Sequence, residues 1–435
     1  MSLQRWSKGV SFYLSDLWSA PKFSKGLKGE TMPIGVAVIG AGMAGRGHAA
    51  AYRAATSLYG SDLPEVRLVS IGDVNETFGK AAADRFGFER SDSDWRRIAD
   101  DPNIDAVSVV VANHLHREIV EGLLAAGKHV LCEKPLSDTI EDAKAMVLAA
   151  NNASSVARIG LTFLRNPAIA AIQQIIASGQ LGRVLHFSGR YWADYSADPK
   201  APMAWRYKGA MGTGALADVG SHISYVSEFI AGAPVKSVSG ARFVTSIKER
   251  PVATGAVLGH NHAEVSDVME AVENDDYAGF TADFGGVAGV IEVSRVAAGH
   301  PTTLTFEVYC ENGAATFDQR RNGEFQLMLN EGPYGQRGFR TVQVGPSHPY
   351  IAGGLAVDAP GVNVGQNDQF FFQNRAFLQE VAGLPESAAL PFCATFEDGL
   401  HNMEILSTVV ESYHQGGISL DVPTASPSYL QKAGR

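Results

Sequence analysis

Three side chains in this sequence, Lys134, Asp218 and His222, are of the chemical types that the oxidation of an alcohol requires. When a hydride leaves a carbon that bears a hydroxyl group, the hydroxyl group loses a proton, so the reaction needs a base with a pKa near 7. Histidine, with an ordinary pKa of about 6.5, suits this role. We expect His222 to accept the proton, Lys134 to orient and stabilise the oxygen, and Asp218 to hold the substrate and tune His222.

The spacing of Asp218 and His222 predicts that both belong to one helix. Apolar residues recur with helical spacing over 214–229, and residues four apart on a helix point the same way. Both side chains can therefore reach one substrate. An Asp–His pair that only decorates a helix surface is the simpler interpretation that this spacing leaves open.

Lys134 comes directly after a predicted strand, residues 129–132, and before Pro135. A following proline confines the lysine backbone to an extended geometry and holds the ammonium group at the carboxyl end of the strand. This arrangement favours a fixed catalytic cation. The simpler interpretation is a surface lysine that pairs with Glu133.

A glycine-rich turn lies near the start of the chain. An apolar run over 34–39 predicts a buried parallel strand, and an alanine-rich stretch from Arg46 to Ala55 predicts the helix after it. Between them, the G-x-G-x-x-G pattern comprises Gly40, Gly42, Met43, Ala44 and Gly45. The glycines allow a tight turn, close approach to a pyrophosphate and packing of helix on strand, so the turn predicts a dinucleotide site.

Asp73 ends the second predicted strand, residues 67–73. A carboxylate in this position can accept hydrogen bonds from the hydroxyl groups of the adenosine ribose, which favours NAD over NADP. NADP remains open, as does a purely structural Asp73.

Further strands predicted over 106–111 and 129–132 continue an alternation of strands and helices. In such doubly wound parallel sheets, ligands lie beyond the carboxyl ends of the strands. We therefore single out Asn113 and His116 after the first of these strands, and Glu133 with Lys134 after the second.

These elements resemble the Gfo/Idh/MocA oxidoreductase family. The resemblance spans nearly the whole chain from Pro33 to about Leu420. The motifs that carry it are Gly40-x-Gly42-x-x-Gly45 followed by His48, Asn113-x-x-His116, Cys132-Glu133-Lys134-Pro135-Leu136, Arg165-Asn166-Pro167, Trp205-Arg206 and Gly214-x-x-x-Asp218-x-Gly220-x-His222.

The resemblance implies roles for several residues. It makes Lys134 a catalytic lysine on the substrate side and places Glu133 near the nicotinamide ribose. It adds Asn113 and His116 to the cofactor site, and Arg165, Trp205 and Arg206 to the substrate site beside Lys134, Asp218 and His222. It also implies a homodimer or homotetramer.

The strand pattern changes after about residue 159. Longer alternating runs, several joined by glycine-containing links, predict an α+β domain with a large, mostly antiparallel, open-faced sheet. The predicted strands cover 184–191, 235–246, 277–284, 287–296, 303–310, 314–318 and 325–329. Helices over 368–381 and 396–414 close the chain. A half-apolar bare sheet face normally packs on another copy, so a homo-oligomer is expected.

We divide the chain into an N-terminal extension or arm (1–32), an α/β Rossmann domain (33–158) and a substrate-binding and oligomerisation domain (159–435). The extension carries more aromatic residues than a solvated tail needs, which indicates that it packs against something. The family resemblance implies an arm that packs on a neighbouring subunit, and a frayed extension is the other interpretation. The aromatic residues are Trp6, Phe12, Tyr13, Trp18 and Phe23.

Composition excludes several classes of function. The 36 Lys and Arg residues against 46 Asp and Glu residues give a formal net charge of -10, so we expect no nucleic-acid or membrane partner. Three cysteines without a C-x-x-C pair indicate reduced thiols in a cytoplasmic protein. His260 and His262 could form a metal pair, but no third ligand is placed, so we expect a solvated loop and no metal.

The sequence therefore predicts an NAD(P)-dependent oxidoreductase that transfers a hydride between nicotinamide and a hydroxyl-bearing carbon of a sugar, inositol or related polyol. Two alternatives stay open. One is an NAD-dependent glycosidase on the same scaffold, and the other is a non-catalytic, dinucleotide-responsive binding protein.

Overall fold

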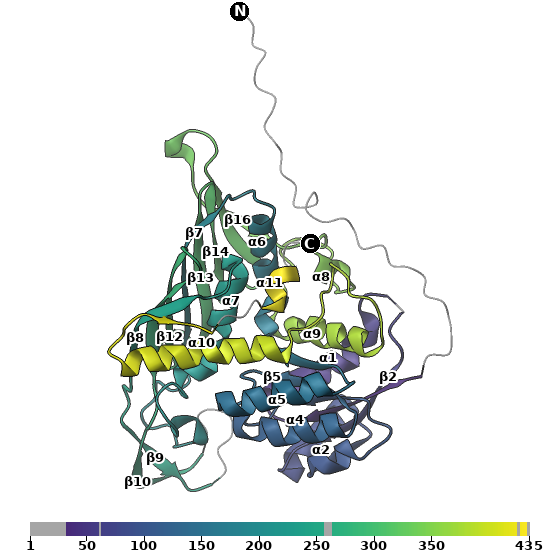
Figure 1. The fold of residues 1–435 in the computed structure, drawn as a ribbon. Helices are drawn as coiled ribbons and strands as arrows, with labels where there is room; N and C mark the ends of the chain where they lie inside the picture. Colours follow the sequence, from purple (N-terminus) through teal and green to yellow (C-terminus); the bar gives the residue numbers. More distant parts are fainter. Residues whose placement is uncertain (1–31, 61, 256–262, 424–426, 433–435) are drawn as a thin grey trace, which may run out of the picture.

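The fold is built on two large sheets, one for each predicted domain (Figure 1). The computed structural model describes residues 32–60, 62–255, 263–423 and 427–432. The expected arm, except for its last residue, lies outside the described residues, as do His260 and His262.

The first domain contains a parallel sheet of six strands in the order β3-β2-β1-β4-β5-β6. The strands are β1 (Ile34–Ile39), β2 (Val66–Gly72), β3 (Arg90–Asp92), β4 (Ala106–Val109), β5 (His129–Glu133) and β6 (Ala157–Gly160). The helices are α1 (Met43–Ala54), α2 (Glu76–Phe86), α3 (Trp95–Ala99), α4 (His116–Ala125) and α5 (Ile140–Asn152). Every residue of β1 is buried, because central strands of such sheets are covered on both faces. This confirms the doubly wound sheet.

The second domain contains a sheet of nine strands in the order β16-β15-β14-β13-β7-β12-β11-β8-β17. Only the β7–β12 pair is parallel among the described neighbours, which confirms a mostly antiparallel sheet. The strands are β7 (Val184–Ala193), β8 (Ser237–Val244), β11 (Tyr277–Asp283), β12 (Ala288–Ser294), β13 (Thr302–Cys310), β14 (Gly313–Asp318), β15 (Glu324–Leu329), β16 (Arg340–Gln343) and β17 (Leu420–Asp421).

Helices cover one face of this sheet. α6 (Pro167–Ala177), α7 (Ser221–Ala231) and α10 (Phe396–His414) pack against its strands. α6 begins where Asn166 caps it, accepting hydrogen bonds from the backbone N–H groups of the next turn. Burial alternates along β12, where Val290 is 48% exposed between buried neighbours. In the described part of the chain no helix covers this second face, as the open-faced prediction requires.

A small hairpin stands apart from both sheets. β9 (Glu249–Ala253) and β10 (Val265–Ala271) pair antiparallel with each other. The sequence analysis predicts neither strand. Most of β10 is exposed, so its residues give no core-facing alternation for a pattern search to detect.

One late helix returns to the first domain. α9 (Gln366–Val381) packs against α1, and its Phe372 and Ala376 belong to the same hydrophobic core as Val36 of β1. The hydrophobic core of the first domain therefore includes residues from beyond the predicted boundary at residue 158. The C-terminal segment also forms the short helices α8 (Pro349–Ala352) and α11 (Ser428–Lys432).

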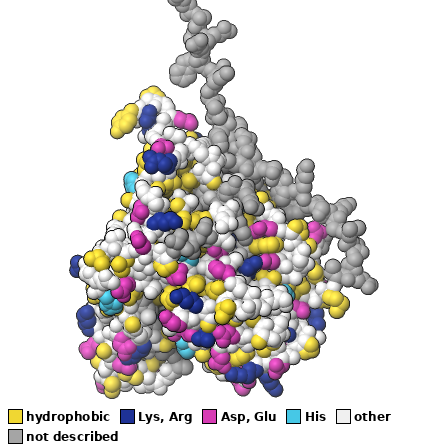
Figure 2. All heavy atoms as spheres, viewed as in Figure 1, with side chains coloured by type: hydrophobic (Ala, Val, Ile, Leu, Met, Phe, Trp, Pro, Cys, Tyr) yellow, Lys and Arg dark blue, Asp and Glu magenta, His cyan; other side chains and the backbone are white. Residues whose placement is uncertain are grey.

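The molecular surface mixes charges. Figure 2 shows basic and acidic side chains interspersed over one face, unlike the continuous basic stripe of a nucleic-acid-binding surface. Among the described residues, every helix is too short or too polar to cross a bilayer.

Candidate active site

The glycine turn between β1 and α1 has the features of a phosphate cradle. Gly40 has a φ of 108°, and a Cβ atom on Gly45 would lie only 1.8 Å from Gly40 O. A Cβ atom on Gly42 would meet no heavy atom within 4 Å. Gly40 and Gly45 are thus required by the protein's own packing, whereas the space beside Gly42 is open to a ligand. No side chain caps α1, so the first N–H groups of this helix remain available to phosphates.

The other two residues of the turn stand at the start of α1. Met43 is 69% exposed and Ala44 is half-buried. Both contribute backbone N–H groups of the first helical turn, the part of a helix that attracts anions. The donor set fits the pyrophosphate of a dinucleotide.

Asp73 ties the turn to the end of β2. Its Oδ2 accepts a hydrogen bond from the Ala41 N–H group (2.9 Å), and its Oδ1 accepts one from Asn75 N–H (2.8 Å). Each carboxylate oxygen has a second lone pair, so a half-buried Asp73 can still accept from ribose hydroxyl groups.

The structure separates the roles of Asn113 and His116. Asn113 begins the short helix η3 (Asn113–Leu115) and is half-buried beyond β4. His116 is completely buried, and its ring nitrogens lie 3.1 Å from Leu136 O and 3.2 Å from Val111 O. Burial lowers the pKa of His116 despite these carbonyl groups. His116 thus links the loop after β4 to the loop after β5 through two backbone carbonyl groups.

Glu133 at the end of β5 is anchored to α1. Its Oε1 lies 3.0 Å from His48 Nε2, and the other ring nitrogen of His48 lies 2.9 Å from Ser108 Oγ. The Lys134 N–H group donates to Glu133 Oε2 (3.3 Å). The surface ion pair between the Glu133 and Lys134 side chains, the simpler interpretation, is therefore not formed: Glu133 pairs with His48 inside the domain.

Lys134 instead reaches across to the second domain. Its Nζ donates to the backbone oxygen of Asp218 (2.8 Å) and lies 3.5 Å from Asp218 Oδ1. The structure therefore brings together two of the three predicted catalytic side chains, although 84 residues separate them in the chain.

Asp218 lies on a π-helical turn, η6 (Leu216–Gly220), that leads into α7. The sequence analysis predicts ordinary helix over 214–229, so the first part of that prediction is wrong. Buried Asp275 supplies the physical reason: its carboxylate accepts hydrogen bonds from Gly212, Gly214 and Leu216 N–H groups and so shapes the entry to the turn. π-helical turns occur frequently at functional sites.

Opposing effects set the charge of Asp218. Desolvation raises its pKa, but the Lys134 ammonium, a hydrogen bond from Tyr195 Oη to Oδ2 (2.5 Å) and the Arg206 guanidinium outweigh it. The net pKa of Asp218 is lowered to about 2. Asp218 is thus a fixed carboxylate, an acceptor that can bind hydroxyl groups.

Trp205 and Arg206 lie in the short helix η5 (Trp205–Tyr207). The Arg206 guanidinium lies 4.5 Å from the centre of the Trp205 ring, which is 54% exposed. Arg206 is close enough for its charge to lower the pKa of Asp218, and Trp205 packs on its guanidinium.

A buried polar network fixes this segment, and sequence reasoning missed it. Arg295 forms an ion pair with Asp276 (2.9 Å) and donates to Arg206 O (2.9 Å), while Asn274 Nδ2 also donates to Arg206 O (3.0 Å). The signal in the sequence was the polar run Asn274-Asp275-Asp276 directly before an apolar strand, where polar residues are unusual.

His222 lies in the first turn of α7 and completes the site. Its Nδ1 is 2.8 Å from Tyr225 Oη, and the ring packs on Phe163 with 5.0 Å between centroids. Burial and the positive charge of Lys134 hold the pKa of His222 well below 6.5, although Asp218 acts the other way. The imidazole is therefore neutral at pH 7.

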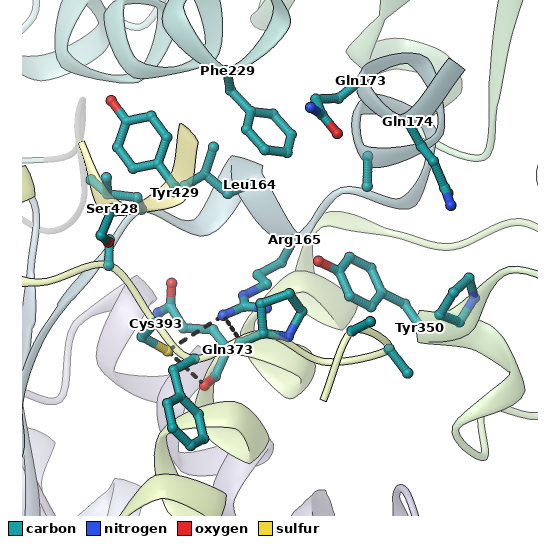
Figure 3. A pocket seen from close by; sticks show the side chains of 18 of the residues that line it. Leu164, Arg165, Gln173, Gln174, Phe229, Tyr350, Gln373, Cys393, Ser428 and Tyr429 are labelled. Atoms are coloured by element: carbon teal, nitrogen blue, oxygen red, sulfur yellow. Dashed lines mark hydrogen bonds between the residues drawn. The ribbon is translucent and has the colours of Figure 1, made fainter. Parts of the chain in front are cut away.

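Arg165 lies elsewhere, in a cavity of about 310 Å³ between the C-terminal segment and α6 (Figure 3). Its Nη2 donates to Pro391 O (2.6 Å) and lies 3.8 Å from Cys393 Sγ. Neither Lys134 nor His222 lines this cavity. The structure therefore does not bring Arg165 together with the other predicted substrate residues, and its visible role is to fasten the C-terminal segment.

Two family matches cover most of the described chain. Residues 34–161 match GFO_IDH_MocA, described as an oxidoreductase family with an NAD-binding Rossmann fold. Residues 169–316 match the GFO/IDH/MocA C-terminal domain.

Individual proteins and one solved structure also match, over 54% to 90% of this chain. Levoglucosan dehydrogenase of Pseudarthrobacter phenanthrenivorans is 35% identical over 384 residues, which cover 87% of this chain and 96% of that protein. The NAD(+)-dependent scyllo-inositol 2-dehydrogenase of Bacillus subtilis is 27% identical over 239 residues, 54% of this chain and 61% of that one. A structure of levoglucosan dehydrogenase with NADH and levoglucosan superposes with a TM-score of 0.80 at 32% identity, covering 90% of this chain and 100% of that one.

The glycine turn provides a matched pair of variants. Gly42→Ala adds a carbon that meets only a ligand, so we expect dinucleotide affinity to fall about tenfold or more, since one carbon forced into a close contact costs about 1–3 kcal/mol. Its melting temperature should not change. Gly45→Ala places the same carbon against Gly40 O and should instead lower the melting temperature. Calorimetry of NAD binding and of unfolding measures both effects, and equal NAD affinity in Gly42→Ala and the unaltered protein would contradict the cradle.

Asp73 provides a test of cofactor preference. We expect the unaltered protein to bind NAD more tightly than NADP, because the carboxylate repels a 2′-phosphate. Asp73→Asn keeps an oxygen that can accept from Ala41 N–H and removes the charge. The ratio of the two affinities should fall about fivefold or more, because two charges about 4 Å apart interact by about 1 kcal/mol even with the full screening of bulk water. Equal or tighter binding of NADP by the unaltered protein would refute this role.

Proposed function

This chain belongs to the GFO/IDH/MocA family of oxidoreductases, and on that premise we propose that it oxidises a hydroxyl-bearing carbon of a sugar, inositol or related polyol with NAD. One observation carries the proposal. Lys134, at the end of a strand of the nucleotide-binding sheet, contacts Asp218, and the neutral imidazole of His222 lies in the next helical turn.

The substrate class follows from the chemistry of the site and from named relatives. A carboxylate at Asp218, a cation at Lys134 and an exposed ring at Trp205 suit a molecule with several hydroxyl groups and an apolar face. The relatives include dehydrogenases of levoglucosan and of scyllo-inositol. An activity assay with a panel of polyols and anhydrosugars, read as NADH absorbance, identifies the particular substrate.

The residues that would hold the cofactor follow the ends of β1, β2, β4 and β5. The turn at Gly42 would take the pyrophosphate, Asp73 the adenosine ribose, and Glu133 with Asn113 the nicotinamide end. When bound, NAD supplies the acceptor for the hydride.

The protein's own groups handle the oxygen. The ammonium of Lys134 stabilises the negative charge that develops there, and it is pre-positioned because the Asp218 backbone oxygen already holds it. Asp218 Oδ1 accepts a hydrogen bond from a neighbouring hydroxyl of the substrate. The proton of the reacting hydroxyl group passes to one of two nitrogens in its neutral form, the amine of Lys134 or Nε2 of His222.

The glycosidase and the dinucleotide-responsive binding protein, the two alternatives, each predict a behaviour that differs from that of a dehydrogenase. A glycosidase on this scaffold would cleave a glycoside without net NADH, and a dinucleotide sensor would need no acid–base pair at Lys134 and His222. We therefore favour the dehydrogenase.

We also propose a homodimer or homotetramer that assembles through the uncovered face of the nine-stranded sheet. Support comes from exposed apolar and aromatic groups on that face, such as Val290 and the stacked rings of His186 and Tyr309, which lie 4.5 Å apart. A cytoplasmic location is supported by Cys132, Cys310 and Cys393, which are buried free thiols.

His222→Ala separates catalysis from cofactor binding. We expect turnover to fall by about 10²–10⁴-fold, the usual worth of a group that exchanges or holds a proton at the reacting atom. NAD affinity should stay nearly unchanged because the phosphate-binding turn belongs to the other domain. Steady-state NADH formation and NAD titration provide the two measurements. Lys134→Ala should also lower turnover, and the double variant should lose less than the sum of the single losses in activation free energy. A His222→Ala protein with most of its turnover would remove His222 from the mechanism.

Removal of residues 1–30 tests the proposed arm. If the arm packs on a neighbouring subunit, the truncated protein should melt about 2 °C or more below the full chain and sediment as a smaller or weaker oligomer. NAD affinity should be unchanged. Identical melting and sedimentation of the two proteins would indicate a frayed extension.

A further inference from the structure

We propose that Tyr225 is a positioning residue that fixes neutral His222 in the tautomer with its proton on Nε2, so that His222 meets the substrate oxygen as a hydrogen-bond donor. The role of His222 toward a substrate oxygen rests on the proposed function. The tautomer itself follows from the hydrogen bonds of the protein.

The hydroxyl group of Tyr225 determines the tautomer of His222. Tyr225 is completely buried in α7, three residues after His222. Its Oη accepts a hydrogen bond from the backbone N–H of Phe163 (3.2 Å) and lies 2.8 Å from His222 Nδ1. Among the described residues these are the two hydrogen-bond partners of Oη. Burial holds the pKa of Tyr225 well above 10, so the hydroxyl keeps its proton.

The hydroxyl group has one proton and one acceptor to receive it. A peptide N–H can only donate, so the bond with Phe163 uses a lone pair of Oη and not its proton. The remaining neighbour, His222 Nδ1, must then accept that proton. An accepting Nδ1 carries no hydrogen, and the single hydrogen of a neutral imidazole therefore lies on Nε2.

The other tautomer leaves a buried donor without a partner. If Nδ1 carried the hydrogen, Oη would accept from both Nδ1 and Phe163, and its own proton would point at no acceptor. A buried donor left unpaired costs its full desolvation penalty, whereas the first arrangement satisfies every group. The ring is held in place for either arrangement by Phe163 and by Tyr191, whose centroid lies 5.7 Å away.

The tautomer gives His222 Nε2 and Lys134 Nζ different roles in the reaction. His222 Nε2–H donates to the oxygen on which negative charge develops, as neutral imidazoles do at other carbonyl and alkoxide sites. For the oxidation, the Lys134 ammonium first releases a proton to solvent. The O–H bond of the substrate then breaks, an N–H bond forms on the Lys134 amine, and the ammonium form returns, while the hydrogen on His222 Nε2 stays in place. The sequence analysis assigned the proton to His222 instead, because the ordinary pKa of histidine lies near 7.

Nuclear magnetic resonance of protein labelled with ¹⁵N histidine tests the tautomer without substrate or cofactor. In the full-length protein at pH 7, the His222 signals, identified by their loss in His222→Gln, should show an unprotonated Nδ1 and a protonated Nε2. We expect an excess of about tenfold or more over the other tautomer, the ratio that one unpaired buried hydroxyl group would impose. A protonated Nδ1 with a bare Nε2 would overturn the proposal.

Tyr225→Phe removes the donor, and Tyr191→Phe is its matched control. Both are buried tyrosines beside His222, but the Tyr191 hydroxyl bonds to Gln319. In Tyr225→Phe the excess of the Nε2–H tautomer should shrink, and the pKa of His222 should rise, because a hydrogen bond to the neutral form has been lost. Tyr191→Phe should leave the His222 tautomer unchanged. An unaltered tautomer ratio in Tyr225→Phe would overturn the proposal, and the spectrum of the unaltered protein decides the question if that variant does not fold.

The proposed function and this inference can fail separately. A protein that oxidises no polyol with NAD or NADP would contradict the proposed function, while its ¹⁵N spectrum would still decide the tautomer. A polyol dehydrogenase with a bare His222 Nε2 would keep the function and remove the role of Tyr225.

Discussion

The geometry of the site depends on one contact between domains, the hydrogen bond from Lys134 Nζ to the backbone oxygen of Asp218 at 2.8 Å. The two residues come from different domains, so each domain must present its residue with little freedom. On one side, Glu133 holds the end of β5 to α1 through His48. On the other, the carboxylate of Asp275 shapes the backbone that enters the π-helical turn of Asp218.

Electrostatics makes this contact suitable for alcohol chemistry. The Lys134 cation and the Asp218 carboxylate lie close together, the lysine side chain is largely buried, and the cation lowers the pKa of the carboxylate. The same cation disfavours a second positive charge, so His222 stays neutral beside it. The site therefore offers one lysine cation, one fixed negative charge and one neutral imidazole, which together can bind hydroxyl groups and stabilise an alkoxide.

Local sequence pattern was sufficient wherever one segment determines the structure by itself. The glycine turn, Asp73 after β2 and Lys134 after β5 could be predicted because parallel strands always present their carboxyl ends at one edge of the sheet. Sequence pattern did not predict the structure at positions whose conformation depends on residues far away in the chain. The π-helical turn depends on Asp275, which follows it by more than fifty residues, and no periodicity within 214–229 reports it. Arg165 matched a family motif, yet its direction is set by Pro391 and Cys393. The short edge strands β3, β16 and β17 have too few residues to show alternation.

We expect Lys134 and His222 to meet on one oxygen of a sugar or polyol, and a crystal structure of this chain with NADH and a bound polyol tests this geometry. A single substrate oxygen should lie within about 2.6–3.2 Å of both Lys134 Nζ and His222 Nε2, with its carbon about 3–3.5 Å from the reactive carbon of the nicotinamide. A polyol that binds productively with its reacting oxygen beyond reach of these two nitrogens would show that they do not act on it together.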